Sequence, residues 1–244
     1  MLVALLYHRS GHGKYANPLE ILDAHFRRIA SRYPTVLPGD PLVGKLSVCL
    51  TFDDAFFDFY HHVFPLLKRY RLKALVAVPT AYIPEETSLP PSKRLEGGET
   101  FAATTVPRPS AVFCSWNELK ALADSPLIRI ASHSVHHRPL TSSRIDPETE
   151  LFASKGLLEQ RLGVAVNSFV YPFGLWNKKV HSVAKRYYRY IFRIGNAHNS
   201  SWNSGNRLLY RVNGDRLPRV DFPFDPFCRF KHAVRYRLNT VLGK

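Results

Sequence analysis

The sequence predicts an α/β protein whose fold is a distorted, incomplete (β/α) barrel of about seven strands. Strand patterns alternate with amphipathic helix patterns along almost the whole chain, and such alternation produces a parallel sheet covered by crossover helices. The 244 residues are 45% hydrophobic, which is enough for one large core. No internal repeat or linker divides the chain, so we expect a single domain over residues 1–244.

The expected elements follow from short apolar runs and from apolar residues at helical spacing. The expected strands occupy residues 1–8, 46–52, 74–79, 127–132, 166–171, 190–194 and 217–222. The expected helices occupy residues 17–32, 56–70, 115–124, 146–162, 177–188 and 225–242. Four helix starts have recognisable caps: Asn17 before Pro18, Ser115 in a capping box, Asp146 before Pro147, and Asp225 before Pro226.

Two features interrupt this alternation. Pro65 falls inside a helical pattern and should kink or divide that helix. Residues 81–113 are rich in proline and glycine and form a connection much longer than ordinary ones. We expect this insertion either to act as a lid or substrate-contacting segment, or to be a surface excursion without function.

The last expected helix, at about residues 225–242, is basic and amphipathic. Packing on the core is the default explanation of its apolar stripe, and interfacial membrane binding is the alternative, because basic residues flank the stripe. The stripe consists of Phe227, Phe230, Val234, Leu238 and Val241.

Charge and cysteine content limit which partners and which compartment are expected. The chain has 34 Lys and Arg against 19 Asp and Glu, and its formal charge of +15 indicates either a merely solvated basic surface, which is the default explanation, or attraction to an anionic partner such as a phosphorylated carrier or a membrane face. No nucleic-acid-binding motif accompanies the basic residues, so we expect no nucleic acid partner. Three scattered cysteines form no disulfide framework, and the N-terminus has no basic leader or cleavage site. We therefore expect a cytoplasmic protein, at the inner membrane face if the last helix binds lipid.

Two polar clusters directly follow expected strands. Asp53 and Asp54 end the run at 46–52, and His133 and His137 follow the run at 127–132. In a barrel, the carboxyl ends of all parallel strands open onto one face, so the clusters should meet. One carboxylate and two imidazoles suit a divalent metal with open positions for water and substrate. The second carboxylate is then free to act as a base toward water on the metal, which is the logic of ester or amide hydrolysis.

At these residues the sequence resembles the polysaccharide deacetylases with a NodB-homology domain. Thr-Phe-Asp-Asp at 51–54 is similar to the first family motif, Thr-Phe-Asp-Asp-Gly, and His-Ser-Val-His-His at 133–137 matches the second, His-Ser/Thr-x-x-His. Phe-Val-Tyr-Pro-Phe-Gly at 169–174 resembles the third, in its Tyr-Pro-Tyr-Gly form. With further similar segments, the resemblance covers roughly residues 1–222; these segments are residues 6–8, 63–67 and 217–219.

The resemblance implies a role for each matched residue. Asp53 would be the catalytic base, and Asp54, His133 and His137 would bind zinc, with nickel or cobalt as alternatives. The backbone N–H of Phe173 would contact the oxyanion. The substrate pocket would be lined by Tyr171, Pro172, Gly174 and Arg219.

The sequence also departs from the family pattern. Ala55 replaces the glycine of the first motif, and Val170 stands where many members have an arginine that orients the catalytic aspartate. Arg211 and Arg219 are the candidates to replace that arginine.

The family's Leu-x-His motif, which supplies the histidine that protonates the leaving amine, is missing. His198 is the first candidate for this general acid and His8 the second, although each is also explained as an ordinary loop or pocket histidine.

These observations lead to a metal-dependent hydrolase that removes an N-acyl group, with acetyl as the first choice, from a sugar. Its substrate would be a surface glycan or a carrier-linked intermediate. The alternative is a catalytically silent glycan-binding protein that keeps the metal site but lacks the arginine and the general acid.

Overall fold

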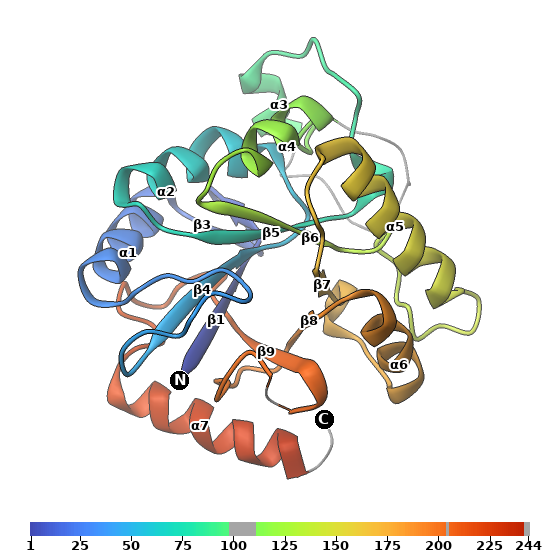
Figure 1. The fold of residues 1–244 in the computed structure, drawn as a ribbon. Helices are drawn as coiled ribbons and strands as arrows, with labels where there is room; N and C mark the ends of the chain where they lie inside the picture. The colour runs from blue at the N-terminus through green and yellow to red at the C-terminus, as the bar shows by residue number, and fades with distance from the viewer. Residues whose placement is uncertain (98–110, 204, 242–244) are drawn as a thin grey trace.

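The computed structural model describes residues 1–97, 111–203 and 205–241, and it shows a closed barrel of seven parallel strands (Figure 1). The strand order is β1-β4-β5-β6-β7-β8-β9, and β9 pairs with β1 to close the ring. The expected α/β barrel of about seven strands is therefore confirmed. The barrel strands are β1 (Leu2–Tyr7), β4 (Ser47–Phe52), β5 (Ala74–Val78), β6 (Ile128–Ser132), β7 (Ser168–Val170), β8 (Tyr190–Ile194) and β9 (Leu208–Asn213).

Helices surround the ring (Figure 1). They are α1 (Leu19–Arg32), α2 (Phe64–Tyr70), α3 (Pro91–Gly97), α4 (Trp116–Ala123), α5 (Pro147–Leu162), α6 (Lys178–Tyr187) and α7 (Pro226–Val241). A small pair of strands, β2 (Arg9–Ser10) and β3 (Ala16–Asn17), follows β1. Within the described residues, none of the helices is long and apolar enough to cross a membrane.

Successive strand residues point alternately into the barrel and out toward the helices, and this produces two apolar layers. The outer layer contains Val3, Val48 and Leu50 packed with the helices. The inner cluster contains Ala4 and Cys49 from the same two strands. Because both faces of each strand are buried, the strands read as continuous apolar runs in the sequence.

Local sequence signals predict the helix cap correctly in three of four cases. At the start of α7, the Asp225 carboxylate accepts a hydrogen bond from Cys228 N–H at 3.0 Å. Ser115 and Glu118 form a complete capping box at α4, and the Asp146 carboxylate accepts hydrogen bonds from two backbone N–H groups at α5. The expected Asn17 cap is wrong, because α1 begins at Leu19 without a side-chain cap. The Asn17 side chain instead donates to the Gly214 carbonyl and accepts from Leu217 N–H, so a contact distant in sequence takes the place of the cap.

The expected strand at 217–222 is also wrong. These residues form turns and irregular backbone, and the seventh strand is β9 at Leu208–Asn213. Pro65 divides its helical pattern as expected: a π-helical turn, Phe59–Val63, precedes α2, and the proline lies in the first turn of α2. The lid expectation for residues 81–113 falls in part on residues 98–110, which lie outside the described residues.

A buried arginine ties α3, in the described part of this insertion, to α4. Arg94 of α3 is 5% exposed and forms two hydrogen bonds to Glu118, at 2.6 and 2.8 Å. It also donates to the carbonyls of Ala111 and Phe113, and its guanidinium lies 3.5 Å from the centre of the Phe57 ring. Glu118 therefore serves both as the α4 cap and as the counter-charge of Arg94.

We expect Glu118→Ala to lower the free energy of unfolding by about 3 kcal/mol, because it leaves the buried Arg94 charge without its carboxylate. Ser115→Ala, which removes only the cap hydrogen bond, should cost about 1 kcal/mol. Denaturant titration of both variants measures the difference. Equal losses in the two variants would show that the Arg94 ion pair contributes nothing beyond the cap.

Candidate metal centre and active site

Strand alternation directs four polar side chains into one end of the barrel. Counting in steps of two from inner-cluster residues of β1, β4, β6 and β9 leads to His8, Asp53, His133 and Arg211. Asp53, His133 and Arg211 are buried, and His8 is about one fifth exposed. His8, Asp53 and His133 lie just past the carboxyl ends of their strands, which is where barrel enzymes place their sites.

Asp54, His133 and His137 form the only cluster of potential metal ligands found among the described residues. One ligand atom from each lies within 4.8 Å of the others, and all three residues are buried. Asp54 Oδ1 is 3.7 Å from His133 Nε2 and 3.5 Å from His137 Nε2. The structure thus brings together the three residues that the sequence assigned to the metal.

Both imidazoles are in the neutral form that can bind a cation. His133 Nδ1 donates a hydrogen bond of 2.7 Å to the Val170 carbonyl, which leaves Nε2 unprotonated and directed toward Asp54. Burial lowers the pKa of His133 and of His137 to about 4, so both rings are neutral at physiological pH. Burial also raises the pKa of Asp54, and the nearby His133 and His8 offset this only in part. A divalent cation fits this donor set of two imidazoles and one carboxylate.

The turns that present these ligands have left-handed backbone conformations. Values of φ are 70° at Asp54, 53° at Ala55, 63° at Ser134, 48° at His137 and 57° at Phe173. Non-glycine residues with positive φ concentrate at functional sites, where surrounding structure maintains the strain. Ala55 occupies the position of the family's glycine, and it adopts the same kind of conformation that glycine would adopt without steric cost.

Asp53 belongs to a second arrangement beside the metal ligands. Arg211 donates to both carboxylate oxygens, with Nη1 to Oδ1 at 2.6 Å and Nη2 to Oδ2 at 2.8 Å. Burial alone would raise the pKa of Asp53, but the charge and hydrogen bonds of Arg211 and the nearby His133 hold that pKa well below its usual range. Asp53 is therefore ionised, fixed in orientation, and only 3.9 Å from His133 Nε2.

The two arginine candidates are now distinguished. Arg211 performs the orienting role that the sequence left open. Arg219 is mostly exposed and pairs with Asp221 and Asp225, and none of its recorded contacts is to the metal cluster or Asp53. Its expected role in substrate binding has no support from these contacts.

A charged histidine completes the group. His8 Nδ1 lies 2.7 Å from Asp215 Oδ2, and Asp215 Oδ1 accepts from the His8 backbone N–H at 3.0 Å. Burial alone would lower the pKa of His8, but Asp215, together with Asp53 and Asp54, raises it to about 9. With Nδ1 engaged by Asp215, the Nε2–H points toward Asp53, 3.9 Å from Oδ2.

His198 lies elsewhere. Its ring lies tilted against that of His232 of α7 with centroids 5.2 Å apart, and the next residue, Asn199, pairs with Leu2 at the start of β1. Leu2 is at the amino end of its strand, whereas Asp53 follows the carboxyl end of β4. The structure therefore does not bring the first candidate for the general acid to the site, and it brings the second.

The third motif lies beside the metal ligands, but its side chains do different things. The Phe173 ring is 44% exposed with its centroid 4.6 Å from that of His137. Tyr171 points outward into the layer between barrel and helices, where its hydroxyl lies 3.1 Å from His181 Nδ1 of α6. Pro172 and Gly174 are buried in the turn, and a Cβ on Gly174 would lie 3.0 Å from Ile194.

One residue of the site, Asp215, was not predicted from the sequence. Asp215 reads as part of an Asn-Gly-Asp turn, and nothing nearby in sequence indicates that it contacts a histidine 207 positions away. Its partner His8 could be predicted from position, because His8 directly follows a buried strand, as the aspartates and His133 do.

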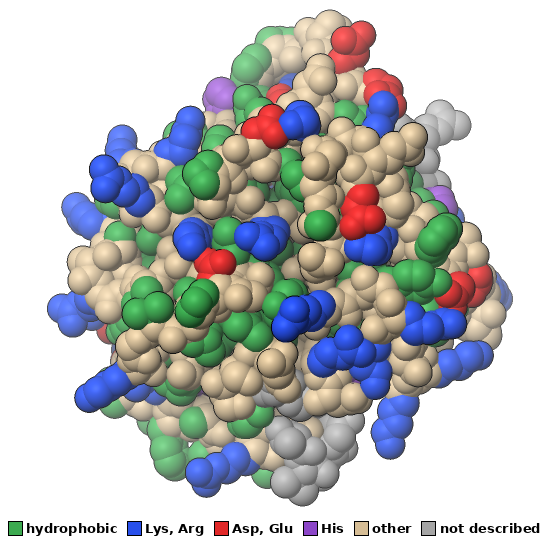
Figure 2. Space-filling view, in the orientation of Figure 1, with side chains coloured by type: hydrophobic (Ala, Val, Ile, Leu, Met, Phe, Trp, Pro, Cys, Tyr) green, Lys and Arg blue, Asp and Glu red, His purple; other side chains and the backbone are tan. Residues whose placement is uncertain are grey.

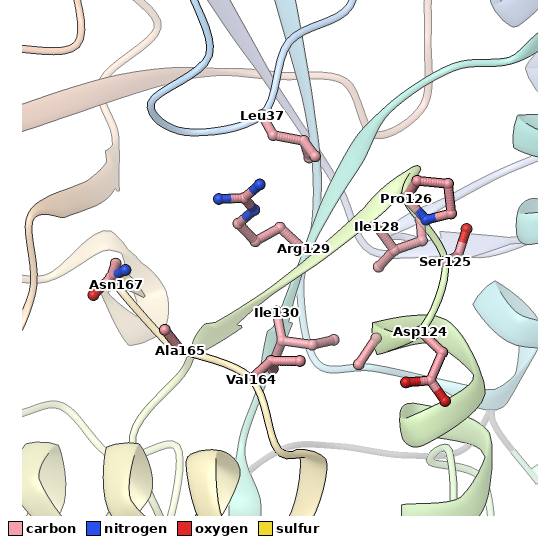
Figure 3. Close-up of a pocket in the computed structure, with 11 residues that line it drawn as sticks. Leu37, Asp124, Ser125, Pro126, Ile128, Arg129, Ile130, Val164, Ala165 and Asn167 are labelled. Carbon is pink, nitrogen blue, oxygen red and sulfur yellow. The ribbon is translucent and has the colours of Figure 1, made fainter.

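Two cavities lie near the barrel ends. One of about 390 Å³ is lined by Ile128, Arg129 and Asn167 and lies at the amino end of β6, opposite to His133 (Figure 3). The other, of about 660 Å³, is lined by residues that include Lys14 and Arg216, the neighbours of Tyr15 and Asp215. Tyr15 and Asp215 contact His8, but none of the residues that line this cavity belongs to the site.

The chain is thus a (β/α) barrel whose site contains a buried Asp-His-His cluster suited to a divalent metal, an ionised aspartate and a charged histidine. The chain matches the family model "Polysaccharide deacetylase" over residues 42–190. It belongs to the polysaccharide deacetylase family. The matched range contains Asp53 and the three metal-ligand candidates, whereas His8 and Arg211 lie outside it.

Individual relatives are more distant. The poly-beta-1,6-N-acetyl-D-glucosamine N-deacetylase of Escherichia coli strain K12 is 30% identical over 96 residues, which are 39% of this chain and only 13% of that protein's length. The structure of the Streptococcus pyogenes deacetylase PplD in complex with acetate is 22% identical with a TM-score of 0.72, covering 90% of this chain and 95% of that one. BC0361, a polysaccharide deacetylase from Bacillus cereus, is 19% identical with a TM-score of 0.73, covering 94% and 67%. These two likenesses concern the fold.

Adjacent histidines provide a matched test of the metal centre. We expect His137→Ala to weaken zinc binding by more than about a hundredfold, because it removes one of three ligands. His136→Ala should leave zinc affinity unchanged, because His136 Nδ1 pairs with Glu150 at 2.6 Å outside the cluster. Competition titration with a chromophoric chelator measures both affinities. Equal zinc affinity in the two variants would place the ion elsewhere.

Proposed function

We propose that this chain is a metal-dependent hydrolase that removes an N-acetyl group from a sugar in a surface glycan or its intermediate. The observation that carries the proposal is the division of labour between adjacent carboxylates. Asp54 lies with two neutral imidazoles, whereas Asp53 is held ionised by Arg211 and is free to accept a proton. Amide hydrolysis at a metal centre needs such a base beside the ligands.

The chain's own groups support each proton movement. Asp54, His133 and His137 would hold zinc or a similar cation, which supplies Lewis acidity toward a carbonyl oxygen and makes water more acidic. Asp53 takes the proton of the attacking water, and Arg211 keeps its carboxylate in place. The backbone N–H of Phe173, in the turn beside His137, is our proposed additional contact for the developing oxyanion.

His8 is the proposed general acid in place of His198. Its raised pKa keeps the ring protonated at neutral pH, and Asp215 fixes the ring so that Nε2–H faces the site. From there it can protonate the departing amine nitrogen, without which an amide does not release its leaving group. The sequence-based case for a silent glycan-binding protein rested on a missing arginine and a missing acid, and Arg211 and His8 fill both places.

The substrate class is supported in two ways. The curated relative is an N-deacetylase of a polymer of N-acetyl-D-glucosamine, which supports an N-acetylated hexosamine as the reacting sugar. A cavity is lined in part by Lys14 and Arg216, whose sequence neighbours Tyr15 and Asp215 contact His8, and this basic lining supports an anionic group on the substrate, such as the phosphates of a lipid-linked carrier. A carrier-linked substrate would place the protein at the inner membrane face.

The decisive experiment measures acetate release from N-acetylated glucosamine oligomers by the zinc-loaded protein. We expect Asp53→Asn to lower kcat by more than about a thousandfold, because the asparagine side chain cannot accept the proton of the attacking water. The control is the zinc content of the variant, which should equal that of the wild type. Oligomer binding without acetate release by the wild-type protein would instead establish the silent glycan-binding function.

The pH dependence tests His8. The acid must be protonated, and its pKa is raised to about 9, so kcat/KM should fall as the pH rises through about 9. Asp215→Asn removes the charge that raises this pKa and should move the alkaline limb toward about 6.5, the ordinary value for histidine. Rates measured from pH 5 to pH 11 locate the alkaline limb of the wild type and of the variant. An unmoved limb in Asp215→Asn, or full activity in His8→Gln, would exclude His8 as the acid.

A further inference from the structure

Helix α7 packs on the barrel with its less apolar side. His232 is buried, and Cys228, Tyr236 and Asn239 are half-buried on the same side. The contacts are specific: the His232 carbonyl accepts from His198 N–H at 3.4 Å, and Asn239 Nδ2 donates to the Gly195 carbonyl at 3.3 Å. Figure 1 shows the helix along the outer edge of the barrel, next to β1 and β9.

The apolar stripe of α7 consequently faces solvent. Phe227 is 74% exposed, Phe230 70%, Val234 40% and Leu238 54%. Positions 227, 230, 234 and 238 lie along one face of a helix, opposite the side occupied by His232. The default expectation that this stripe covers the core is therefore wrong for these four residues; the side chain of Val241 lies outside the described part of the chain.

Basic side chains border the stripe on both edges. At 100° per residue, Lys231 and Arg235 fall on one edge of the stripe, and Arg237 and Arg229 fall on the other. All four are exposed, and the helix contains no acidic residue. Lys and Arg also outnumber acidic side chains on the face of the molecule shown in Figure 2. The pattern is thus apolar in the centre, cationic at both margins.

We propose that this α7 face, defined by Phe227, Phe230, Val234 and Leu238 with their basic borders, binds the surface of an anionic lipid bilayer. Exposed aromatic and aliphatic side chains enter the boundary between headgroups and acyl chains, and the long basic side chains reach the phosphates. Charge complementarity selects this occupant, since every charged side chain on the helix is positive. The face shares no residue with the metal centre, so the proposal does not depend on the proposed hydrolase activity.

The test is flotation of the full chain with phosphatidylcholine vesicles containing about one third phosphatidylglycerol, against pure phosphatidylcholine vesicles. We expect binding to the anionic vesicles that weakens with added salt. The double variant Phe227→Ser with Phe230→Ser should lower the bound fraction more than about tenfold. The matched control, Val43→Ser with Leu89→Ser, removes two apolar side chains that are 56% and 51% exposed elsewhere, and it should bind as the wild type does.

A charge-matched pair separates local from global electrostatics. Lys231→Glu with Arg235→Glu should reduce binding more than about tenfold, whereas Lys178→Glu with Lys179→Glu, with the same change in net charge on exposed residues of α6, should not. His137→Ala should bind vesicles normally, which keeps this test apart from the metal centre. Absent vesicle binding, equal losses in the control variants, or a dimer held by this face that ignores vesicles would overturn the proposal.

Discussion

The bidentate ion pair between Arg211 and Asp53 is the interaction on which the rest of the site depends. Both groups are almost completely buried, and a buried carboxylate without a counter-charge would take up a proton. Arg211 prevents this, and its two hydrogen bonds also fix the rotation of the carboxylate. A third hydrogen bond, to Thr51 Oγ1, ties the guanidinium to the strand that carries Asp53. Removing one partner of such a pair costs about 3–5 kcal/mol, so base and barrel are stabilised together.

The neighbouring carboxylate has the opposite electrostatic environment. Burial raises the pKa of Asp54, and two neutral imidazoles lie 3.7 and 3.5 Å from its Oδ1. The cluster therefore lacks a positive charge that a divalent cation supplies. Strained backbone at Asp54, Ala55 and His137 maintains this geometry, and the buried strands beneath hold the strain. One strand end thus serves two chemistries because only one of its two carboxylates faces the arginine.

Barrel closure brings the remaining groups into place. His8 follows β1, and Arg211 and Asp215 lie in and just after β9, which is the strand that closes the ring against β1. The two ends of the chain therefore meet beside Asp53, although the residues matched by the family model lie between them. The same closure places α7 against the loop after β8, with its apolar side facing outward. The active-site groups and the lipid-binding face both depend on where the last quarter of the chain packs.

The sequence by itself determined the alternation of strands and helices, the strand ends that carry chemistry, and the two polar clusters, one of aspartates at 53 and 54 and one of histidines at 133 and 137. These are local patterns: an apolar run, a period, or a polar residue directly after a strand. It did not determine β9, because Leu208–Asn213 includes the buried charge of Arg211 and lacks the pattern of an apolar strand. Nor could it choose between His8 and His198, between Arg211 and Arg219, or between the two faces of α7. Each choice depends on which residues, distant in sequence, meet when the ring closes. The spacing of residues along the sequence does not show which of them will be close in space.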